Sequence, residues 1–327
     1  MKLENSKVLV IGGAGFIGSF VVTELLKYPV EQVVVYDNFA RGNAEYLDEQ
    51  LKDERCSIFP FGGDIREIDV LNTAMEGMDY VISLAAMWLL HCKDYPRTAF
   101  NVNIAGTFNV LEACVKNNIK KLIWSSSASV YGDAVELPMT EDHPFNNKNF
   151  YGASKIAGEA MCTAFNDRYG LKVIGLRYMN VYGPHQDQTA AYTGVVPIML
   201  NKIEANEAPT INGDGSQAYD FIYVEDVARS NIQALISDQD FGMYNVGTEI
   251  QTSINELCEL ILELKNSDLK VKYNPYSEDD ARAMVKNRIG SRVKAEKEIG
   301  FKYKYELREG LQKLIDWRIT TGVDKKR

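Results

Sequence analysis

Short apolar runs alternate with amphipathic segments along the first half of the chain. Runs rich in Val, Ile and Leu, typical of strands buried on both faces, occupy positions 8–11, 33–36, 57–61, 80–84, 122–125 and 173–176. Segments with helical spacing lie between most of them, and the clearest are 16–27 and 98–116. Continuous apolar strands separated by helices predict a parallel sheet covered on both faces, the doubly wound α/β arrangement.

The pattern changes after position 181. Gly183-Pro184, the polar stretch 185–193 and the turn 212–215 are typical of loops, and helical spacing then returns at 196–205, 224–236, 253–264 and 307–318. We therefore predict a Rossmann-type domain over 1–180, to which 220–248 returns. A smaller C-terminal lobe is expected from 181–219 and 249–327.

Composition narrows the classes of protein that fit. The 327 residues are 46% hydrophobic and 25% charged with a net charge of -9, which argues against a general nucleic-acid binder or a basic membrane-surface protein. No apolar run approaches the ~18 residues of a membrane span. Five scattered cysteines without CxxC spacing and only three histidines favour neither a zinc site nor a disulfide framework. We expect a cytoplasmic protein without a metal.

A glycine-rich segment follows the first predicted strand. Gly12 permits a tight turn, Gly15 lets main chain approach a pyrophosphate, and Gly18 lets the next helix pack closely on the strand. The helix N-terminus supplies N–H groups and the positive end of its dipole. Asp37, at the end of the second strand, can accept hydrogen bonds from an adenosine ribose and repels a 2′-phosphate. The constellation predicts NAD in preference to NADP.

Tyr151 and Lys155 form a candidate proton-transfer pair. Their i, i+4 spacing places both on one face of a predicted helix, although an ordinary surface pair has the same spacing. A lysine ammonium ~5 Å from the phenol would contribute about 3 kcal/mol and lower a tyrosine pKa of about 10 by roughly 2 units. Ser125, Ser126 and Ser127 end a predicted parallel strand at the edge that faces the ligand crevice. Tyr151, Lys155 and one of these serines are therefore expected to act on a secondary alcohol.

Motifs along nearly the whole chain, from Lys7 to about Trp317, carry a family resemblance. They are GGAGFIG at 12–18, DN at 37–38, GDIR at 63–66, LAA at 84–86, NIAGTFNVLEA at 103–113, SSSASVYG at 125–132, YGASK at 151–155, LRYMNVYGP at 176–184 and GDGSQAYDFIYVEDVA at 213–228. Together they closely resemble the extended short-chain dehydrogenase/reductase family, in particular its nucleotide-sugar epimerase/dehydratase branch.

This resemblance implies roles for individual residues. The implied NAD contacts are Gly12, Gly15, Phe16, Ile17, Gly18, Asp37, Asn38, Asp64, Ile65, Leu84, Ala85, Ala86, Asn103, Ser125, Tyr151, Lys155 and Tyr178. The implied substrate contacts are Ser127, Asn180, Val195, Val196, Tyr219 and Arg282. Ser127 and Tyr151 would address the reacting sugar hydroxyl, with Lys155 on the nicotinamide ribose. A homodimer through helices at 98–116 and 151–169 is also implied.

The residues after Ser127 bear on which reaction of the branch is expected. Dehydratases of the branch carry an Asp-Glu pair there and related decarboxylases keep a Glu, whereas this chain has Ala128 and Ser129. Neither residue can act as a general acid or base near neutral pH. The resemblance then favours a 4-epimerase of a nucleotide-diphosphate sugar, a UDP-sugar first. A reductase, dehydrogenase or dehydratase of the same family remains the alternative, and a non-catalytic NAD-sensing protein a remote one.

Three departures from the family pattern leave the nucleotide and sugar open. Tyr219 stands where the family usually has an Arg on a substrate phosphate, and an Arg-Pro-Gly-Asp segment is replaced by 278–288. Arg282 and Arg288 are candidates for a phosphate contact, because a guanidinium binds phosphate through two N–H groups, or are solvated surface charges. The insertion 87–92 is expected either to pack against the core or to reshape the sugar pocket.

Overall fold

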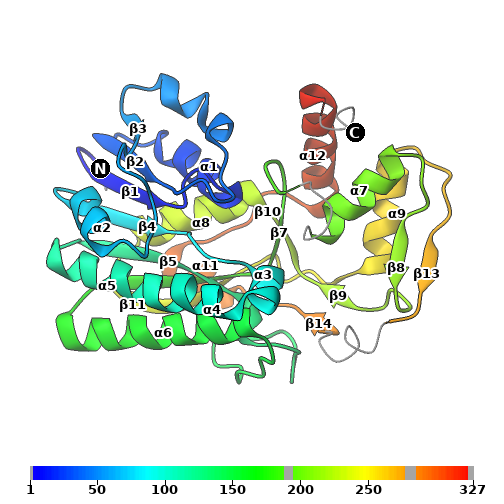
Figure 1. The fold of residues 1–327 in the computed structure, drawn as a ribbon. Helices are drawn as coiled ribbons and strands as arrows, with labels where there is room; N and C mark the ends of the chain where they lie inside the picture. Colours follow the sequence, from blue (N-terminus) through cyan, green and yellow to red (C-terminus); the bar gives the residue numbers. More distant parts are fainter. Residues whose placement is uncertain (1–2, 188–193, 277–284, 323–327) are drawn as a thin grey trace.

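The computed structural model describes residues 3–187, 194–276 and 285–322. A parallel sheet of seven strands forms the centre of the larger lobe (Figure 1). Its strands are β1 (Lys7–Ile11), β2 (Gln32–Tyr36), β3 (Cys56–Ile58), β4 (Tyr80–Ser83), β5 (Lys121–Ser127), β6 (Val173–Tyr178) and β11 (Phe241–Val246). They lie in the order β11-β6-β5-β4-β1-β2-β3. The outward order from β1 reverses at the β1–β4 boundary, where a doubly wound sheet opens its ligand crevice.

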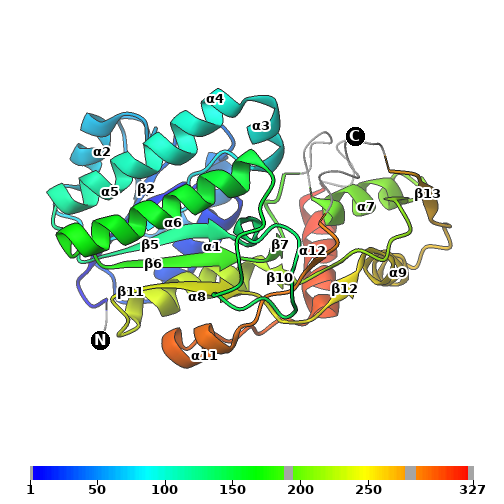
Figure 2. The same ribbon diagram turned by 90° about the horizontal axis from the view of Figure 1, so that it is seen from below.

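Helices cover both faces of this sheet (Figure 2). One face carries α1 (Phe16–Leu25), α8 (Val224–Ile236) and α11 (Val293–Ile299), and the other carries α2 (Ile68–Met75), α5 (Thr107–Lys116) and α6 (Phe150–Tyr169). Alternate residues of β1 pack on opposite faces of the sheet. Val8 and Val10 belong to one apolar cluster, and Leu9 and Ile11 belong to the other. The predicted α/β fold with parallel strands buried on both faces is confirmed.

A smaller lobe lies beyond the carboxyl ends of these strands. It contains α7 (Val195–Glu204), α9 (Ile254–Leu264), α12 (Leu307–Thr321), β8 (Thr210–Asn212), β9 (Ala218–Tyr219), β12 (Thr252–Ser253), β13 (Lys272–Asn274) and β14 (Asn287–Arg288). Leu200, Leu257 and Leu311 are among the buried side chains of its own core. The parallel pair β7 (Asn180–Tyr182) and β10 (Phe221–Tyr223) joins it to the sheet.

The segment 98–116, predicted as one helix, changes between α-helical and π-helical turns along its length. It consists of α4 (Pro96–Ala99), a π-helical segment at Phe100–Gly106 and then α5. Inside the π-helical segment, the Asn103 side chain turns inward toward the main chain of Met87. π-Helical turns of this kind are frequent beside functional sites. The insertion at 87–92 contributes a short helix, α3 (Leu89–Asp94), packed against α6.

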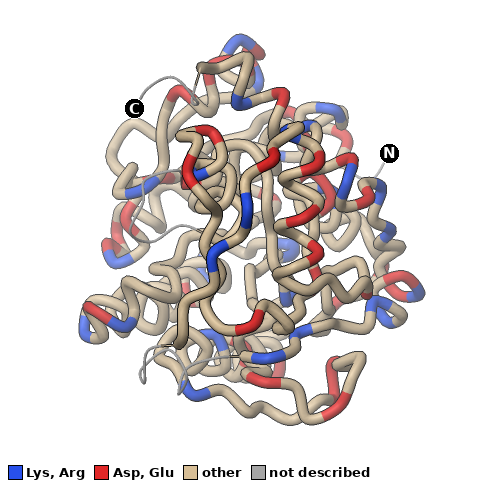
Figure 3. Tube along the Cα trace, turned by 90° about the vertical axis from the view of Figure 1, so that its right-hand side faces the viewer, with Lys and Arg blue, Asp and Glu red and all other residues tan. Residues whose placement is uncertain are grey.

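The remaining short elements are 3-10 turns at Ala44–Leu47, Gln50–Lys52 and Ala128–Val130. Lys and Arg positions are interspersed with Asp and Glu along the trace (Figure 3). Among the helices that the structure describes, none combines the length and apolar character needed to cross a bilayer.

Candidate active site

The predicted site residues gather at the carboxyl edge of the sheet. The seven strands run parallel, so the residues that follow them meet at one edge. Gly12 follows β1, Asp37 follows β2, Leu84 follows β4, and Ser127 ends β5. This is the edge where doubly wound sheets bind their ligands.

The glycine loop is shaped for close approach of main chain to a ligand. Gly12 has a φ of 77°, and a Cβ there would lie 2.8 Å from the main-chain nitrogen of Ala85. A Cβ at Gly18 would lie 2.1 Å from the Gly12 carbonyl oxygen, so helix and loop could not pack as they do. Helix α1 begins at Phe16 without a side-chain cap, which leaves its amino end open to an anion. These features fit the pyrophosphate of a dinucleotide.

Asp37 is held by main chain at the end of β2. Its carboxylate oxygens accept hydrogen bonds from the N–H groups of Ala14 (3.0 Å) and Phe39 (2.9 Å). Burial raises the pKa of Asp37, and these two hydrogen bonds oppose that effect. The carboxylate therefore lies at a fixed position beside the glycine loop, where an adenosine ribose would be read.

The expected NAD contacts Asn38, Asp64 and Ile65 lie near Asp37, directly after β2 and in the loop after β3. Asn38 donates a hydrogen bond to the Asp64 carboxylate, which also forms an ion pair with Arg66 at 2.6 Å. The Arg66 hydrogen bond is the main cause that lowers the pKa of Asp64. Ile65 is buried against Gly106, so its main chain is the part available to a ligand.

Tyr151 lies in the first turn of α6, and local contacts fix that turn. The Asn149 side chain caps the helix by accepting a 2.8 Å hydrogen bond from the Gly152 N–H. A Cβ at Gly152 would lie 2.4 Å from the Ser129 carbonyl oxygen, so only glycine lets the turn approach the end of β5 this closely. The close approach brings the start of α6, with Tyr151, against the end of β5, with Ser127.

The expected acidic shift of Tyr151 is wrong in this structure. Burial raises the pKa of Tyr151 to about 12, while the Ser127 hydrogen bond and the Arg288 charge lower it. The Lys155 ammonium lies 5.7 Å from the centroid of the Tyr151 ring and does not offset the loss of hydration. The predicted shift corresponds to an effective dielectric typical of a protein surface, whereas Lys155 is buried and Tyr151 is partly buried.

Lys155 is fixed against the sheet beneath Tyr151. Its ammonium donates a 2.6 Å hydrogen bond to the Ser125 carbonyl oxygen and lies 4.9 Å from the centroid of the Trp124 ring. Burial lowers the pKa of Lys155 to about 8. An ammonium has three N–H donors, so others remain for a ligand.

Asn103 links three parts of the site. Its amide oxygen accepts from the Met87 N–H (2.7 Å), and its amide nitrogen donates to the Met87 carbonyl (2.8 Å) and the Ser154 hydroxyl (3.1 Å). Both N–H groups therefore have protein acceptors, and Asn103 fixes the main chain after β4 against α6. The Cys92 thiol, buried beside it, donates to the Met87 carbonyl, so the insertion at 87–92 packs around this centre.

Tyr178 lies in the core of the larger lobe. The expected substrate residues Asn180, Val195 and Val196 lie toward the smaller lobe. The Tyr178 hydroxyl donates to Asn231 at 2.9 Å inside the core. Asn180 is on β7, and Val195 and Val196 open α7, where the buried Val196 side chain leaves main chain for a ligand. Arg282 lies outside the described residues.

Tyr219 and Arg288 face each other across two short strands. They are paired in the parallel register of β9 and β14. The Tyr219 hydroxyl donates to the Val285 carbonyl at 2.8 Å, so this tyrosine holds the segment that leads into β14. Tyr219 therefore braces the chain beside Arg288.

Comparison with known proteins agrees with this geometry. Residues 8–247 match the model of the NAD dependent epimerase/dehydratase family, well over half of the chain. The chain belongs to that family.

Relatives of this family member cover nearly its whole length. A putative UDP-glucose 4-epimerase of Methanocaldococcus jannaschii is 34% identical over 95% of this chain and 97% of its own. A solved UDP-N-acetylglucosamine 4-epimerase from Methanobrevibacter ruminantium, in complex with UDP-N-acetylmuramic acid, is 33% identical with a TM-score of 0.90. It covers 98% of this chain and 100% of that one. A Thermus thermophilus UDP-glucose 4-epimerase complex with NAD is 31% identical with a TM-score of 0.83, covering 95% and 98%.

Sequence reasoning missed the buried ion pair of this epimerase/dehydratase-family chain. Arg177 on β6 binds both carboxylate oxygens of Glu159 on α6, at 2.8 and 2.7 Å, and Ser126 donates to the same carboxylate. Arg177 also donates to the Tyr131 hydroxyl. The available signals were an arginine inside an apolar strand and a glutamate four positions after Lys155 on the same helix face.

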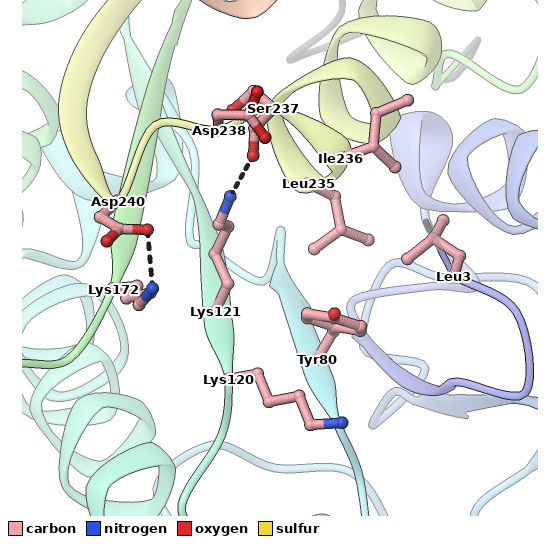
Figure 4. Close-up of a pocket in the computed structure, with 10 residues that line it drawn as sticks. All are labelled: Leu3, Tyr80, Lys120, Lys121, Lys172, Leu235, Ile236, Ser237, Asp238 and Asp240. Atoms are coloured by element: carbon pink, nitrogen blue, oxygen red, sulfur yellow. Dashed lines mark hydrogen bonds and ion pairs between the residues drawn. The ribbon is translucent and has the colours of Figure 1, made fainter. Parts of the chain in front are cut away.

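A hollow lies far from this chemistry, at the edge of the sheet formed by the amino ends of its strands (Figure 4). It is lined by residues at the amino ends of β4, β5 and β6 and at the end of α8, namely Leu3, Tyr80, Lys120, Lys121, Lys172, Leu235, Ile236, Ser237, Asp238 and Asp240. Lys121 donates to the Ser237 carbonyl and Lys172 pairs with Asp240. These two lysines of the hollow therefore already have partners within the protein. No group of three or more potential metal ligands occurs among the described residues.

Proposed function

We propose that this protein is an NAD-dependent epimerase that inverts C4 of a nucleotide-diphosphate sugar, with a UDP-sugar as the first candidate. The observation that carries the proposal is the packing of the first turn of α6, which bears Tyr151, against the end of β5, where Ser127 is followed by Ala128 and Ser129. The site has a phenol to move one proton, and its next two positions hold no second acid or base for elimination.

Each residue of the centre has a role in this scheme. NAD, held by the glycine loop and Asp37, would supply the hydride acceptor and donor for C4. Tyr151 accepts the C4 hydroxyl proton and later returns it to the same oxygen, while Ser127 orients that oxygen. The buried Lys155 ammonium stabilises the phenolate that forms during oxidation, because a charge of opposite sign favours the ionised phenol. The 4-keto sugar stays bound and turns over in the pocket, so that it is reduced on its other face.

The two parts of the chain divide the binding task in this proposal. Residues 1–180 with 220–248 would hold NAD, and 181–219 with 249–327 would hold the nucleotide sugar. Three observations support the division: the glycine loop on β1, the position of β11 at the edge of the same sheet, and the separate apolar core of the smaller lobe.

The test is turnover of UDP-galactose and UDP-galacturonate with absorbance followed at 340 nm. We expect conversion to the C4 epimers without net NADH, and a loss of at least ~100-fold in kcat for Tyr151→Phe. Tyr273→Phe, an exposed tyrosine on β13 of the smaller lobe, is the control. Stoichiometric NADH would identify a net dehydrogenase instead, and full activity of Tyr151→Phe would show that another group is the base.

We also propose a homodimer through the outer faces of α5 and α6. Phe108 on α5 is 44% exposed and Tyr169 on α6 is 59% exposed; the Phe108 ring meets Phe165 edge-on, and the Tyr169 ring meets it at a tilt. These rings border a hollow that also includes Val115. Exposed aromatic surface on two adjacent helices suits a self-complementary interface. Sedimentation should give twice the chain mass, and Phe108→Asp should give monomers.

We infer a cytoplasmic location as well. All five cysteines are buried as free thiols, as expected in a reducing compartment.

A further inference from the structure

Arg288 lies at the junction of the two lobes. It ends the two-residue strand β14, and the strand is tied to the loop that follows Ser127–Val130. The Asp133 carboxylate accepts the N–H groups of Lys286 (2.8 Å) and Asn287 (3.3 Å). The side chain of Arg288 therefore projects from a segment fixed to the active-site end of β5.

The guanidinium of Arg288 has no protein partner in the part of the chain that the structure describes. Arg288 is partly buried, its Nε is buried without a hydrogen bond, and no carboxylate of the described residues forms an ion pair with it. Two fully buried arginines differ, because Arg177 binds Glu159 and Arg318 binds Glu204, each through two nitrogens. Burying a guanidinium without an anion is costly, so a bound anion would complete this arrangement.

The place of β14 puts that anion at the active-site end of β5, because Asp133, in the loop after Ser127–Val130, holds the N–H groups of Lys286 and Asn287 next to Arg288. Tyr219 is the register partner of Arg288 across β9 and β14. Burial lowers the pKa of Arg288, while the charges of Tyr219, Asp133 and Tyr151 raise it. A substrate whose C4 oxygen meets Tyr151 brings the groups next to C4 toward Arg288.

A nucleotide sugar can offer Arg288 two kinds of anion, the diphosphate or a carboxylate attached near C4. The diphosphate is attached to C1, across the pyranose ring from C4. The C6 carbon is attached to C5, the direct neighbour of C4, and an ether on O3 lies equally close on the other side. A carboxylate at either place reaches the region of Arg288 when C4 is at Tyr151, and a guanidinium binds a carboxylate through two N–H groups.

We propose that Arg288 binds a carboxylate on the sugar ring, which makes hexuronates, with the acid at C6, the preferred substrates of this site. This inference rests on the proposed 4-epimerase function. It assigns Arg288 to the sugar and not to the diphosphate, and it gives the smaller lobe a specificity determinant on β14.

The test compares acidic and neutral substrates with Arg288→Gln. For the wild type, kcat/KM with UDP-glucuronate and UDP-galacturonate should exceed kcat/KM with UDP-glucose and UDP-galactose by roughly 10- to 100-fold. Arg288→Gln should remove most of that ratio, and Arg288→Lys should restore part of it. The ratio cancels any effect of the arginine on Tyr151 itself. The carboxylate of UDP-N-acetylmuramic acid is on an O3 ether, whereas that of the hexuronates is at C6. Comparing kcat/KM for the two kinds of substrate shows which position of the acid Arg288 binds.

Lys286→Gln is the matched control, because Lys286 is an exposed cation on the same segment. Its acid-to-neutral ratio should stay at the wild-type value. Thermal unfolding of all variants checks that the fold is kept.

Calorimetric binding separates failure of this inference from failure of the proposed function. UDP alone should bind wild type and Arg288→Gln equally, whereas UDP-glucuronate should bind the variant more weakly. If no nucleotide sugar is epimerised but the acid still binds through Arg288, the 4-epimerase proposal fails and the carboxylate site stands. Preference of the wild type for neutral sugars, or equal weakening of UDP and UDP-glucuronate in the variant, overturns the inference.

Discussion

Lys155 donates a 2.6 Å hydrogen bond to the main-chain oxygen of Ser125, so its ammonium is fixed to β5 directly below the reactive phenol. The contact joins the helix that carries Tyr151 to the strand that carries Ser127. It also gives the charge a defined position, which a flexible surface lysine would lack. The catalytic centre is thus built from one strand end and one helix start.

Removal of the Lys155 charge should slow the reaction more than it weakens substrate binding. We expect Lys155→Met to lower kcat by about 100-fold, because the phenolate loses a fixed cation in a buried site. The effect on KM should be small by comparison. Lys148→Met, an exposed lysine just before the same helix, is the control. Equal kcat values for the two variants would show that the ammonium has no part in the chemistry.

The ion pair between Glu159 and Arg177 should stabilise the fold around the site. Glu159→Gln leaves the Arg177 charge buried without its partner, and we expect a loss of about 3–5 kcal/mol in the free energy of unfolding. Chemical denaturation measures this loss directly. Asp167→Asn, an exposed acid on the same helix, should change stability little. A similar small change for both variants would contradict the role assigned to the pair.

Asp37 should determine the choice between NAD and NADP. Asp37→Asn keeps the shape and one acceptor but removes the negative charge beside the glycine loop. The dissociation constant for NAD should rise roughly 10-fold, and the preference for NAD over NADP should shrink. Fluorescence titration with both dinucleotides checks this, with exposed Asp48→Asn as the control. An unchanged preference would rule out the ribose contact.

His185 should make the protein less stable in acid. Burial lowers its pKa from 6.5 to about 4, and its ring stacks on Tyr46 with a centroid distance of 4.1 Å and shares a hydrogen bond with Ser19. The unfolded chain therefore takes up the proton first, so stability contributed by the neutral ring is lost as pH falls from about 6.5 toward 4.

Replacement of the His185 ring tests the direction of this pH dependence of stability. The drop in Tm between pH 7.5 and pH 5 should be smaller for His185→Asn than for the wild type. His91→Asn on α3 controls for loss of a histidine elsewhere. An equal drop in His185→Asn and wild type would contradict the argument.

The sheet and the glycine loop could be predicted because their signals are local. Apolar runs such as 8–11 and 173–176 mark buried strands, and Gly12 to Gly18 lie between a clear strand and a clear helix. Strands of two or three residues, such as β9 and β14, leave too short a pattern to recognise.

The electrostatics of the site could not be predicted from the same signals. The pKa of Tyr151 depends on burial by segments distant in the chain, which outweighs the charge of Lys155 four positions away. Arg288 is brought to the active-site end of β5 by the hydrogen bonds between the segment that leads into β14 and Asp133 in the loop after β5. Such effects arise from tertiary contacts that no spacing along the chain reveals.

Deuterium at C4 tests the central claim most directly. UDP-galactose and UDP-galacturonate labelled at C4 should yield their epimers with the label still on C4, because the hydride is removed and returned within one site. Mass spectrometry of the product in ordinary water reports this, and no NADH should accumulate at 340 nm. Replacement of the label by solvent hydrogen, or a product lacking the C4 carbon–hydrogen bond, would contradict epimerisation by transient oxidation at Tyr151.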